Sequence, residues 1–450
     1  MRTPGAFTDP MPFWLAAGVL VLLSGPAGAQ NWLDTRIEIA ALINANDYAA
    51  AAELTDTFLE QVRVSFGETS PELGDAHLLV AVVQANNASL LDAEGSVLTG
   101  IEIHEGNEGP LSTRLIEPYI TLGQTYHLVG EYELALGAYN EARNIGRRAY
   151  GLLHEDQLGI LDLMSQSAYR LGGFDEAREL QLEAIDLTQR AYGEDSVEFL
   201  DAHYRYAEWL RGLRRYGEAE RTYFSMQRMI SRAFDDDPIQ NIRLLRVRAI
   251  NQRAFSAGSG YSGDGGMAGL SGSKPSDLEK ALELARSLEE PDPVLEAVIL
   301  RDIGDWNVAY GRFDEIAAPY EAAWQLLDHV EGGSNLQLEW FSDQTVIHAP
   351  AAIYSPLVVN DPDAPSGHVE IGFTIDASGH TRNVEIVSSE PDGVLDYDAA
   401  RQIMTTRFRP RIEDGTLVSS SGAHTWHFRY DPERARRISP NFDRSASFVR

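Results

Sequence analysis

Residues 130–142 read GEYELALGAYNEA, and this stretch decides the fold of most of the chain. After Tyr132, apolar and small residues recur at spacings of three and four, which predicts an amphipathic helix. Gly130 ahead of it predicts a turn, and residues 122–126 (LGQTY) predict a helix before that turn. The segment is therefore expected to be a helical hairpin whose small residues, Ala135 and Ala142, let two helices approach closely.

The hairpin pattern repeats with a fixed period of 42 residues. Five anchor positions carry it: Tyr48, Leu90, Tyr132, Phe174 and Tyr216. An alanine follows each anchor by three residues, at Ala51, Ala93, Ala135, Ala177 and Ala219. A glycine follows the first four anchors by nineteen, at Gly67, Gly109, Gly151 and Gly193. A period in this range is the signature of an α-solenoid, in which each unit buries its apolar face against its neighbours.

These units resemble tetratricopeptide (TPR) repeats in the 42-residue variety of kinesin-light-chain-like arrays. Residues 130–151, 172–193 and 214–234 match the pattern well, and the units anchored on Tyr48 and Leu90 are more degenerate. A further unit is expected at Phe313, with Ile316 in place of the usual alanine. The array is predicted to occupy residues 30–335.

An insertion interrupts the register. Phe313 stands 97 residues after Tyr216, which is two periods plus 13. The surplus falls on residues 256–273, SAGSGYSGDGGMAGLSGS, for which we expect a flexible loop and no helix, extending to about residue 276. The loop contains a G-x-G-x-x-G match, but a dinucleotide site needs a strand before it and a helix after it. No nucleotide site is therefore predicted.

Stacked hairpins are expected to present a concave groove lined by the first helix of each pair. Gln124, Gln166, Tyr204 and Arg205 are candidates for that surface. The repeated tyrosines and phenylalanines are interpreted as packing residues.

After Trp340 the periodicity changes from helical to alternating. Residues 368–375 (HVEIGFTI) and 384–387 predict two strands of a hairpin, and residues 423–430 (AHTWHFRY) predict a last strand. Between them, residues 395–407 predict a helix with one apolar face made of Leu395, Ala399, Ile403 and Met404. The order strand, strand, helix, strand predicts a small α+β (ββαβ) module over residues 345–431.

This module resembles the C-terminal domain of the TonB family. The resemblance rests on elements in a fixed order: Tyr354-Ser-Pro356, Gly367-His-Val369, Phe373-Thr-Ile-Asp376 with Gly379, Ser388-Ser389, Leu395-Asp396 with Ala399-Ala400, Phe408-Arg-Pro410, Asp414-Gly415 and Trp426-His-Phe428. Thr406 departs from the family, which usually has an aromatic residue there, and so does the acidic stretch 360–363.

In the family, the last strand can pair with an extended peptide from an outer-membrane receptor, and the resemblance implies the same kind of partner here. Carried over, the partner-binding residues are Thr425, Trp426, His427 and Phe428. Trp426 and Phe428 are also expected to belong to the core facing the helix. Energy transduction in the family also needs a membrane-spanning helix with a His-bearing polar motif and a long Pro-rich spacer. The apolar run has no His and no such spacer follows it, so an energised transducer is not expected.

The first 29 residues are expected to be a secretory signal peptide. Arg2 precedes an eleven-residue apolar run, and Ala27-Gly28-Ala29 forms a cleavage site before Gln30. The alternative is an uncleaved N-terminal membrane anchor. The complete absence of cysteine excludes disulfides and thiolate sites and suits an exported protein.

Net charge and motif content argue against several classes of partner and of activity. A formal charge of −31 argues against nucleic acid and anionic lipid as partners. No catalytic, cofactor-binding or metal-binding constellation is found, so neither an enzyme nor a cofactor is predicted. The Arg-rich tail, residues 432–450, is expected to be disordered.

Our hypothesis is an exported, periplasmic protein–protein interaction scaffold associated with an envelope or TonB-dependent transport system. The alternative is a membrane-anchored TonB-like component of a receptor-linked transport system that keeps its N-terminal segment.

Overall fold

The computed structural model describes residues 30–87, 89–259, 274–342, 344–349, 357–359 and 364–434. The predicted signal segment, most of the predicted Gly/Ser loop and nearly all of the predicted tail lie outside these residues, and so does the Tyr354-Ser-Pro356 element. The chain divides into two compact units at Tyr206/Ala207, within one helix. Each unit is described by itself.

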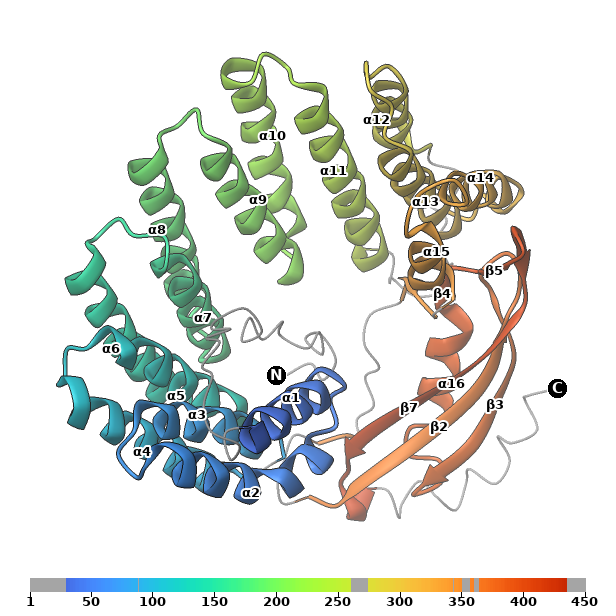
Figure 1. Ribbon diagram of the computed structural model, residues 1–450. Coiled ribbons are helices and arrows are strands. Elements are labelled where there is room, and N and C mark those ends of the chain that lie inside the picture. The colour runs from blue at the N-terminus through green and yellow to red at the C-terminus, as the bar shows by residue number, and fades with distance from the viewer. Residues whose placement is uncertain are drawn as a thin grey trace. The chain divides into compact units, whose positions relative to one another are not determined.

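The first unit consists of helical hairpins that follow one another along the chain (Figure 1). Its elements are α1 (Gln30–Asn44), α2 (Tyr48–Phe66), α3 (Pro71–Asn86), α4 (Leu90–Glu108), the 3₁₀ turn η1 (Thr113–Leu115), α5 (Ile116–Val129), α6 (Tyr132–Tyr150), α7 (Gln157–Arg170), α8 (Phe174–Tyr192) and the first part of α9 (Val197–Gly212).

The 42-residue register sets both ends of the second helix in each hairpin. Helices α2, α4, α6 and α8 each have 19 residues, and the first residue of each is an anchor. Each ends at a register glycine with a positive φ: Gly67 at 101°, Gly109 at 88°, Gly151 at 97° and Gly193 at 93°. Residues with a Cβ rarely adopt this backbone conformation. Glycine therefore allows the chain to leave the helix at these positions.

Close helix packing explains the repeated alanines. All five register alanines are 0% exposed: Ala51, Ala93, Ala135, Ala177 and Ala219. In the central hairpin the fully buried Tyr139 ring lies directly over Gly123 of α5. A Cβ on Gly123 would come within 2.4 Å of the Tyr139 ring. The glycine therefore makes room for the tyrosine within one hairpin.

The second unit continues the helices and ends in the α+β module. Its helical elements are α10 (Tyr216–Ala233), α11 (Pro238–Ser259), α12 (Ser276–Arg286), α13 (Pro293–Ala309), the 3₁₀ turn η2 (Phe313–Glu315), α14 (Ala317–Leu327) and α15 (Gly333–Phe341).

The structure adds detail to the sequence-based expectations at two places in this unit. Residues 256–259 were expected to lie in the loop, but α11 continues through Ser259, because the helix already in progress extends over the small residues that follow it. The anchor Phe313 starts a 3₁₀ turn, and the α-helix begins only at Ala317. Pro319 lies in the first turn of α14, where a missing N–H is tolerated.

The module contains a three-stranded antiparallel sheet in the order β3-β2-β7, formed by β2 (Ser366–Ile375), β3 (Thr381–Glu390) and β7 (Ser420–Arg429) (Figure 1). Helix α16 (Asp396–Thr405) packs against it. Four short strands add two small pairs: β1 (Val346–His348) with β4 (Arg407–Phe408), and β5 (Arg411–Glu413) with β6 (Thr416–Val418).

The predicted alternation of β2 is confirmed. Its alternate residues Val369, Ile371, Phe373 and Ile375 are at most 4% exposed and share a core with α16. Leu395, Ala399 and Ile403 lie in that core as predicted, but Met404 is 59% exposed. Met404 directly follows Ile403, and 100° around the helix turns it out of the apolar face.

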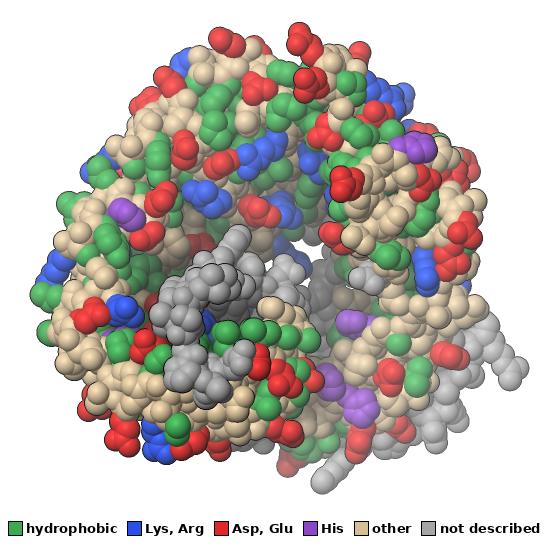
Figure 2. Space-filling model, in the orientation of Figure 1, with side chains coloured by type: hydrophobic (Ala, Val, Ile, Leu, Met, Phe, Trp, Pro, Cys, Tyr) green, Lys and Arg blue, Asp and Glu red, His purple; other side chains and the backbone are tan. Residues whose placement is uncertain are grey.

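None of the helices within the described residues has both the length and the apolar character needed to cross a membrane. The surface of the repeats is strongly charged instead. On the face shown in Figure 2, acidic side chains are spread over the repeat helices and do not gather in one patch.

Candidate protein-binding edge and the junction beside it

Strand β7 lies at one side of the three-stranded sheet, with β2 as its neighbour (Figure 1). Ten consecutive residue pairs join them, from Ser366 opposite Arg429 to Ile375 opposite Ser420. This long regular register fixes the direction of every backbone group along β7.

Backbone groups along β7 alternate between the two sides of the strand. The Tyr430 amide donates to the Pro365 carbonyl, so even-numbered residues direct their N–H and C=O groups toward β2. The neighbouring Arg429 carbonyl accepts from the Val359 amide on the opposite side. Odd-numbered residues of β7 therefore direct their backbone groups to the outer edge.

Both ends of this outer edge are covered. At one end the Gln344 side chain donates to the Ser421 carbonyl at 2.9 Å. At the other, besides the Val359–Arg429 bond, the Asp431 amide donates to the Leu357 carbonyl. Between these points, no described residue pairs with the outward backbone groups of Ala423, Thr425 and His427. The edge thus offers a five-residue window, residues 423–427.

The four residues predicted to bind a partner fall into two pairs. Thr425 and His427 are exposed, and their backbone groups point outward. Trp426 is half-buried and Phe428 is 8% exposed, and both pack against the core beneath the sheet. The expectation that Trp426 and Phe428 are core residues is therefore confirmed for their side chains.

The Trp426 ring also has an exposed neighbour. His424 lies edge-on to it with ring centroids 4.2 Å apart. On the other face of the sheet, His427 lies opposite His368, with ring centroids 6.4 Å apart. The window is therefore bordered by imidazole rings on both faces.

A buried ion pair joins the module to the last repeat helices. Both Arg409 Nε and Nη2 donate to the Asp305 carboxylate at 2.8 Å, and Arg409 Nη1 donates to the Trp340 carbonyl at 2.7 Å. Arg253 Nη1 lies 3.2 Å from the same carboxylate, and the Tyr320 hydroxyl donates to it at 2.7 Å. This cluster links α11, α13, α14 and the segment after β4.

The charges of the cluster stabilise one another. Burial acts to raise the pKa of the Asp305 carboxyl, but the Arg409 charge and hydrogen bonds, with help from Arg253 and Tyr320, hold that pKa well below its usual value. Burial and the Asp305 charge both raise the pKa of the Tyr320 hydroxyl. The ion pair is therefore charged, and Tyr320 is protonated and donates.

Apolar packing follows the same path. Ile347 of β1 and Ile412 of β5 belong to one core with Tyr320, Trp340 and Phe341 of the repeat helices. Trp324 lies beside Gly415, 3.6 Å from the position of its missing Cβ. The short strands are thus part of the repeat core as much as of the module.

Sequence reasoning did not single out Asp305 or Arg409. Asp305 stands eight residues before its anchor, the position held by Gln124 and Gln166 in earlier repeats. Those two glutamines were groove candidates, and both are partly exposed. The same position is Ala40, Val82 and Glu208 in the other units, so its residue type carried no signal for Asp305. The groove candidate Tyr204 was wrong: it is 6% exposed, because it packs inside its unit.

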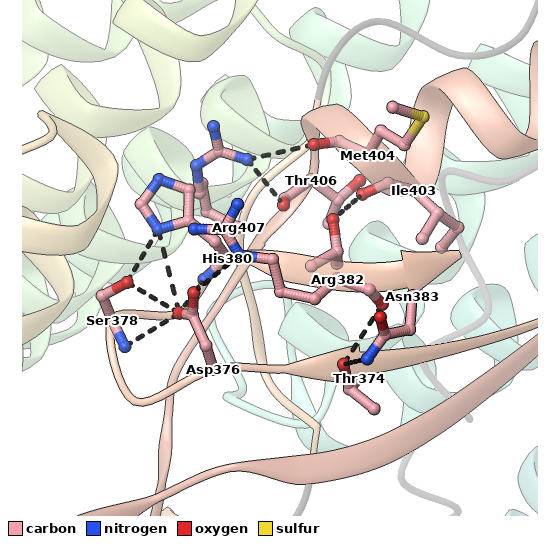
Figure 3. A network of polar contacts seen from close by, with 11 residues as sticks. Thr374, Asp376, Ser378, His380, Arg382, Asn383, Ile403, Met404, Thr406 and Arg407 are labelled. Carbon is pink, nitrogen blue, oxygen red and sulfur yellow. Dashed lines mark hydrogen bonds and ion pairs between the residues drawn. The ribbon is translucent and has the colours of Figure 1, made fainter. Parts of the chain in front are cut away.

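The turn between β2 and β3 contains a second polar network (Figure 3). The Asp376 carboxylate accepts from the Ser378 amide and hydroxyl, from the His380 amide and from Arg382 Nε, at 2.6–3.0 Å. Together these bonds lower the pKa of Asp376, against the effect of burial. The turn packs against η2 of the repeats, where the centroids of the Phe313 and His380 rings lie 4.2 Å apart.

Within the described ranges, no group of three or more His, Cys, Asp or Glu side chains could hold a metal ion. The polar clusters above are joined by arginines, which serve as donors to carboxylates and carbonyls.

The fold and these contacts define a helical-repeat protein that carries a TonB-like C-terminal module. The family model described as "Gram-negative bacterial TonB protein C-terminal" matches residues 364–430, which lie within the module. A search of curated protein sequences found no significant match.

Several solved structures are similar to the helical part. Nearly identical TPR-like repeats of a protein described as a kinesin light chain from Podosopora anserina are 12% identical, with 46% of this chain and 98% of that chain covered and a TM-score of 0.38. The C-terminal part of a TPR repeat-containing protein from Cytophaga hutchinsonii is 14% identical, with coverages of 67% and 98% and a TM-score of 0.34. A tetratricopeptide repeat protein from Parabacteroides merdae is 15% identical, with coverages of 69% and 98% and a TM-score of 0.30. The description of the array as TPR-like rests on the 42-residue register of its own helices.

Proposed function

We propose that this protein is a non-enzymatic interaction scaffold whose β7 edge binds an extended protein segment by strand addition. The observation that supports it is the window of outward backbone groups at Ala423, Thr425 and His427, bounded by covered groups at Ser421 and Arg429. An added strand would gain main-chain hydrogen bonds from the protein, and the side chains beside the window would select its sequence.

The window also sets what the partner must be. Because only about five residues of β7 are open, the bound segment is short and extended, and it supplies alternate N–H and C=O groups. Proline at a bonded position of the partner would remove a donor and weaken binding. The flanking imidazoles of His427 and His424 favour a polar or aromatic neighbour.

A backbone substitution tests this mode of binding. Full-length protein would be used as bait to select extended peptides from a random peptide library. Thr425→Pro removes one outward N–H and is expected to weaken selected peptides by about tenfold or more, while Thr425→Ala keeps the N–H and binds nearly as well. Equal binding by both variants, with unchanged circular dichroism, would mean that the peptides bind elsewhere.

We further propose that the chain is exported and acts in the periplasm as part of an envelope or TonB-dependent transport system, with an outer-membrane receptor as the partner. The layout of residues 1–29 and the family of the module support this proposal. Mass spectrometry of the native protein tests export: a mature chain that begins at Gln30 supports it. Retention of Met1 would favour the membrane-anchored alternative.

The proposal of an outer-membrane receptor as partner is tested in cells that produce the protein. Cross-linking of intact cells, followed by purification of the wild-type protein, is expected to recover an outer-membrane protein. The Thr425→Pro variant should lose that protein and Thr425→Ala should keep it. If the same protein is recovered from both variants, β7 is not its binding site.

A further inference from the structure

The carboxamide of Gln344 covers one end of the open edge of β7. Its Nε2 donates to the Ser421 carbonyl at 2.9 Å, two residues before the window begins at Ala423. Ser421 is an odd-numbered residue, so this carbonyl points to the same outer edge as the open backbone groups of the window. A side chain thus occupies an acceptor that an added strand would otherwise use.

The glycine beside Ser421 lets Gln344 approach the strand. A Cβ on Gly422 would lie 2.8 Å from both Nε2 and Oε1 of Gln344 and 2.6 Å from the Phe373 ring. The carboxamide therefore lies directly against the backbone of β7, which the absence of a Cβ at position 422 makes possible. A carboxamide carries the same N–H and C=O groups as a peptide bond, so Gln344 imitates part of an added strand.

The backbone near Gln344 is held at two points. Phe341, which ends α15, is 1% exposed and packs in the core of the last repeat helices. On the other side, the Thr345 carbonyl accepts from the Arg409 amide at 2.8 Å. The Gln344 side chain therefore reaches β7 from a position that the surrounding structure fixes, which lowers the entropy cost of its hydrogen bond.

The other end of the window is closed in a different way. There, backbone hydrogen bonds join Arg429 and Asp431 to residues 357–359, which lie along the same edge. At the Gln344 end, the bond to the Ser421 carbonyl comes from an exposed side chain. The Gln344 end is therefore the one that a single side-chain substitution can open without a change in the path of the backbone.

We infer that Gln344 is a specificity-determining residue, which limits the length of the protein segment that can add to β7. With its carboxamide in place, a partner pairs with residues 423–427. Without the carboxamide, the open edge extends to Ser421 and accepts a segment that is longer by two residues. This inference rests on the proposed strand addition and names the residue that sets the extent of pairing.

Opening this end adds one outward position to the edge. Outward backbone groups recur at every second residue of β7, so the position next to Ala423 is Ser421. Its N–H and C=O groups would add two main-chain hydrogen bonds to a longer partner. In the wild-type protein, by contrast, the partner has to turn away from β7 beside Ala423, because the Gln344 side chain occupies the next acceptor.

The hydrogen bond is tested on the free full-length protein by NMR. Gln344→Ala removes the carboxamide and should shift the Ser421 carbonyl-carbon signal, because that oxygen then loses its donor. Thr345→Ala is the matched control. It changes the neighbouring side chain, keeps the backbone carbonyl that accepts from the Arg409 amide, and should leave the Ser421 signal in place. An unchanged Ser421 signal in Gln344→Ala would overturn the inference without any peptide.

The effect on partner length is measured with synthetic peptides. The probes are the paired portion of one peptide that the full-length wild-type protein selects, and two longer forms with two valines added at the N-terminus or at the C-terminus. Gln344→Ala is expected to bind one longer form about tenfold more tightly than the parent, with the Ser421 amide protected from hydrogen exchange. The wild-type protein and Thr345→Ala should bind all three peptides alike and leave Ser421 unprotected.

The two possible failures are distinguishable. If the window amides of Ala423, Thr425 and His427 are protected but Gln344→Ala gains nothing from either longer peptide, strand addition stands and the role of Gln344 is wrong. If the window amides are unprotected in every protein while a peptide is bound, or if no peptide is selected, strand addition itself is contradicted and the role of Gln344 with it.

Discussion

Arg409 and Asp305 are 104 residues apart in the sequence, yet they form a two-point ion pair with both contacts at 2.8 Å. Arg409 belongs to the Phe408-Arg-Pro410 motif of the TonB-like module, and Asp305 belongs to α13 of the last repeats. Both side chains are nearly fully buried. The module is therefore held by a repeat position that is partly exposed in two earlier repeats, at Gln124 and Gln166.

Removal of Arg409 is expected to be costly. Arg409→Ala leaves the Asp305 carboxylate buried with weaker partners, and loss of one member of a buried pair typically costs about 3–5 kcal/mol. Chemical denaturation of the full-length protein measures the loss. Arg411→Ala, which breaks the exposed pair with Glu413, is the control and should cost less than about 1 kcal/mol. Similar losses for the two variants would show that the buried pair is not special.

Two tyrosines in equivalent repeat positions give a matched test of the same cluster. Tyr320 and Tyr139 each lie over a glycine sixteen residues earlier, but only Tyr320 has a partner for its hydroxyl. Tyr320→Phe removes a hydrogen bond to a charged group and should cost about 1.5–3 kcal/mol. Tyr139→Phe should be neutral or stabilising, because its buried hydroxyl has no partner. Equal effects in denaturation experiments would contradict this assignment.

Glycine has different roles at two positions of one hairpin. Gly123→Ala would place a Cβ 2.4 Å from the Tyr139 ring and should destabilise the protein by about 1–3 kcal/mol. Gly137→Ala, within α6, has no atom within 4 Å of the new Cβ. It should stabilise the protein by about 0.5–1 kcal/mol through helix propensity. The thermal unfolding midpoints of the two variants should therefore move in opposite directions.

His127 is expected to make stability depend on pH. Burial, and to a lesser extent the Arg170 charge, lowers its pKa to about 4, while the ring contacts the Ser167 hydroxyl at 2.7 Å. In the unfolded chain the pKa of this imidazole is about 6.5. Between about pH 4 and pH 6.5 the imidazole is therefore protonated in the unfolded chain and neutral in the folded protein. This contribution to stability is complete above about pH 6.5 and is lost as pH falls toward 4.

The variant His127→Gln is expected to remove that share of the pH dependence. Unfolding free energies of the variant and of the wild-type protein at pH 7 and pH 5 measure it. If His127→Gln unfolds with the wild-type slope, its imidazole is not the responsible group.

The helical register could be predicted from the sequence because it depends on local spacing. The anchors Tyr132 and Phe174 begin helices, and Gly151 and Gly193 end them, since these residues set the backbone directly. The alternation of β2 was equally readable, because one buried face imposes a period of two. The end of α11 was misplaced, since a helix already formed continues over Gly258.

The junction could not be predicted because it depends on contacts between distant segments. Nothing in the neighbourhood of Asp305 or Arg409 indicates that the two meet, and an Asp in an acidic chain carries little information. The open window on β7 had the same difficulty: Thr425 and Trp426 are adjacent, and only the pairing register with β2 decides which backbone group points outward. The family resemblance predicted that the last strand binds a partner. The register with β2 shows which of its residues direct their backbone groups outward.

Amide hydrogen exchange along β7 tests the central claim most directly. It is measured by NMR on the full-length protein with and without a selected extended peptide. Strand addition predicts slowed exchange at Ala423, Thr425 and His427, with little change at His424 and Trp426, whose amides already face β2. Protection of all five amides alike, or of none while the peptide is bound, would contradict binding at this edge.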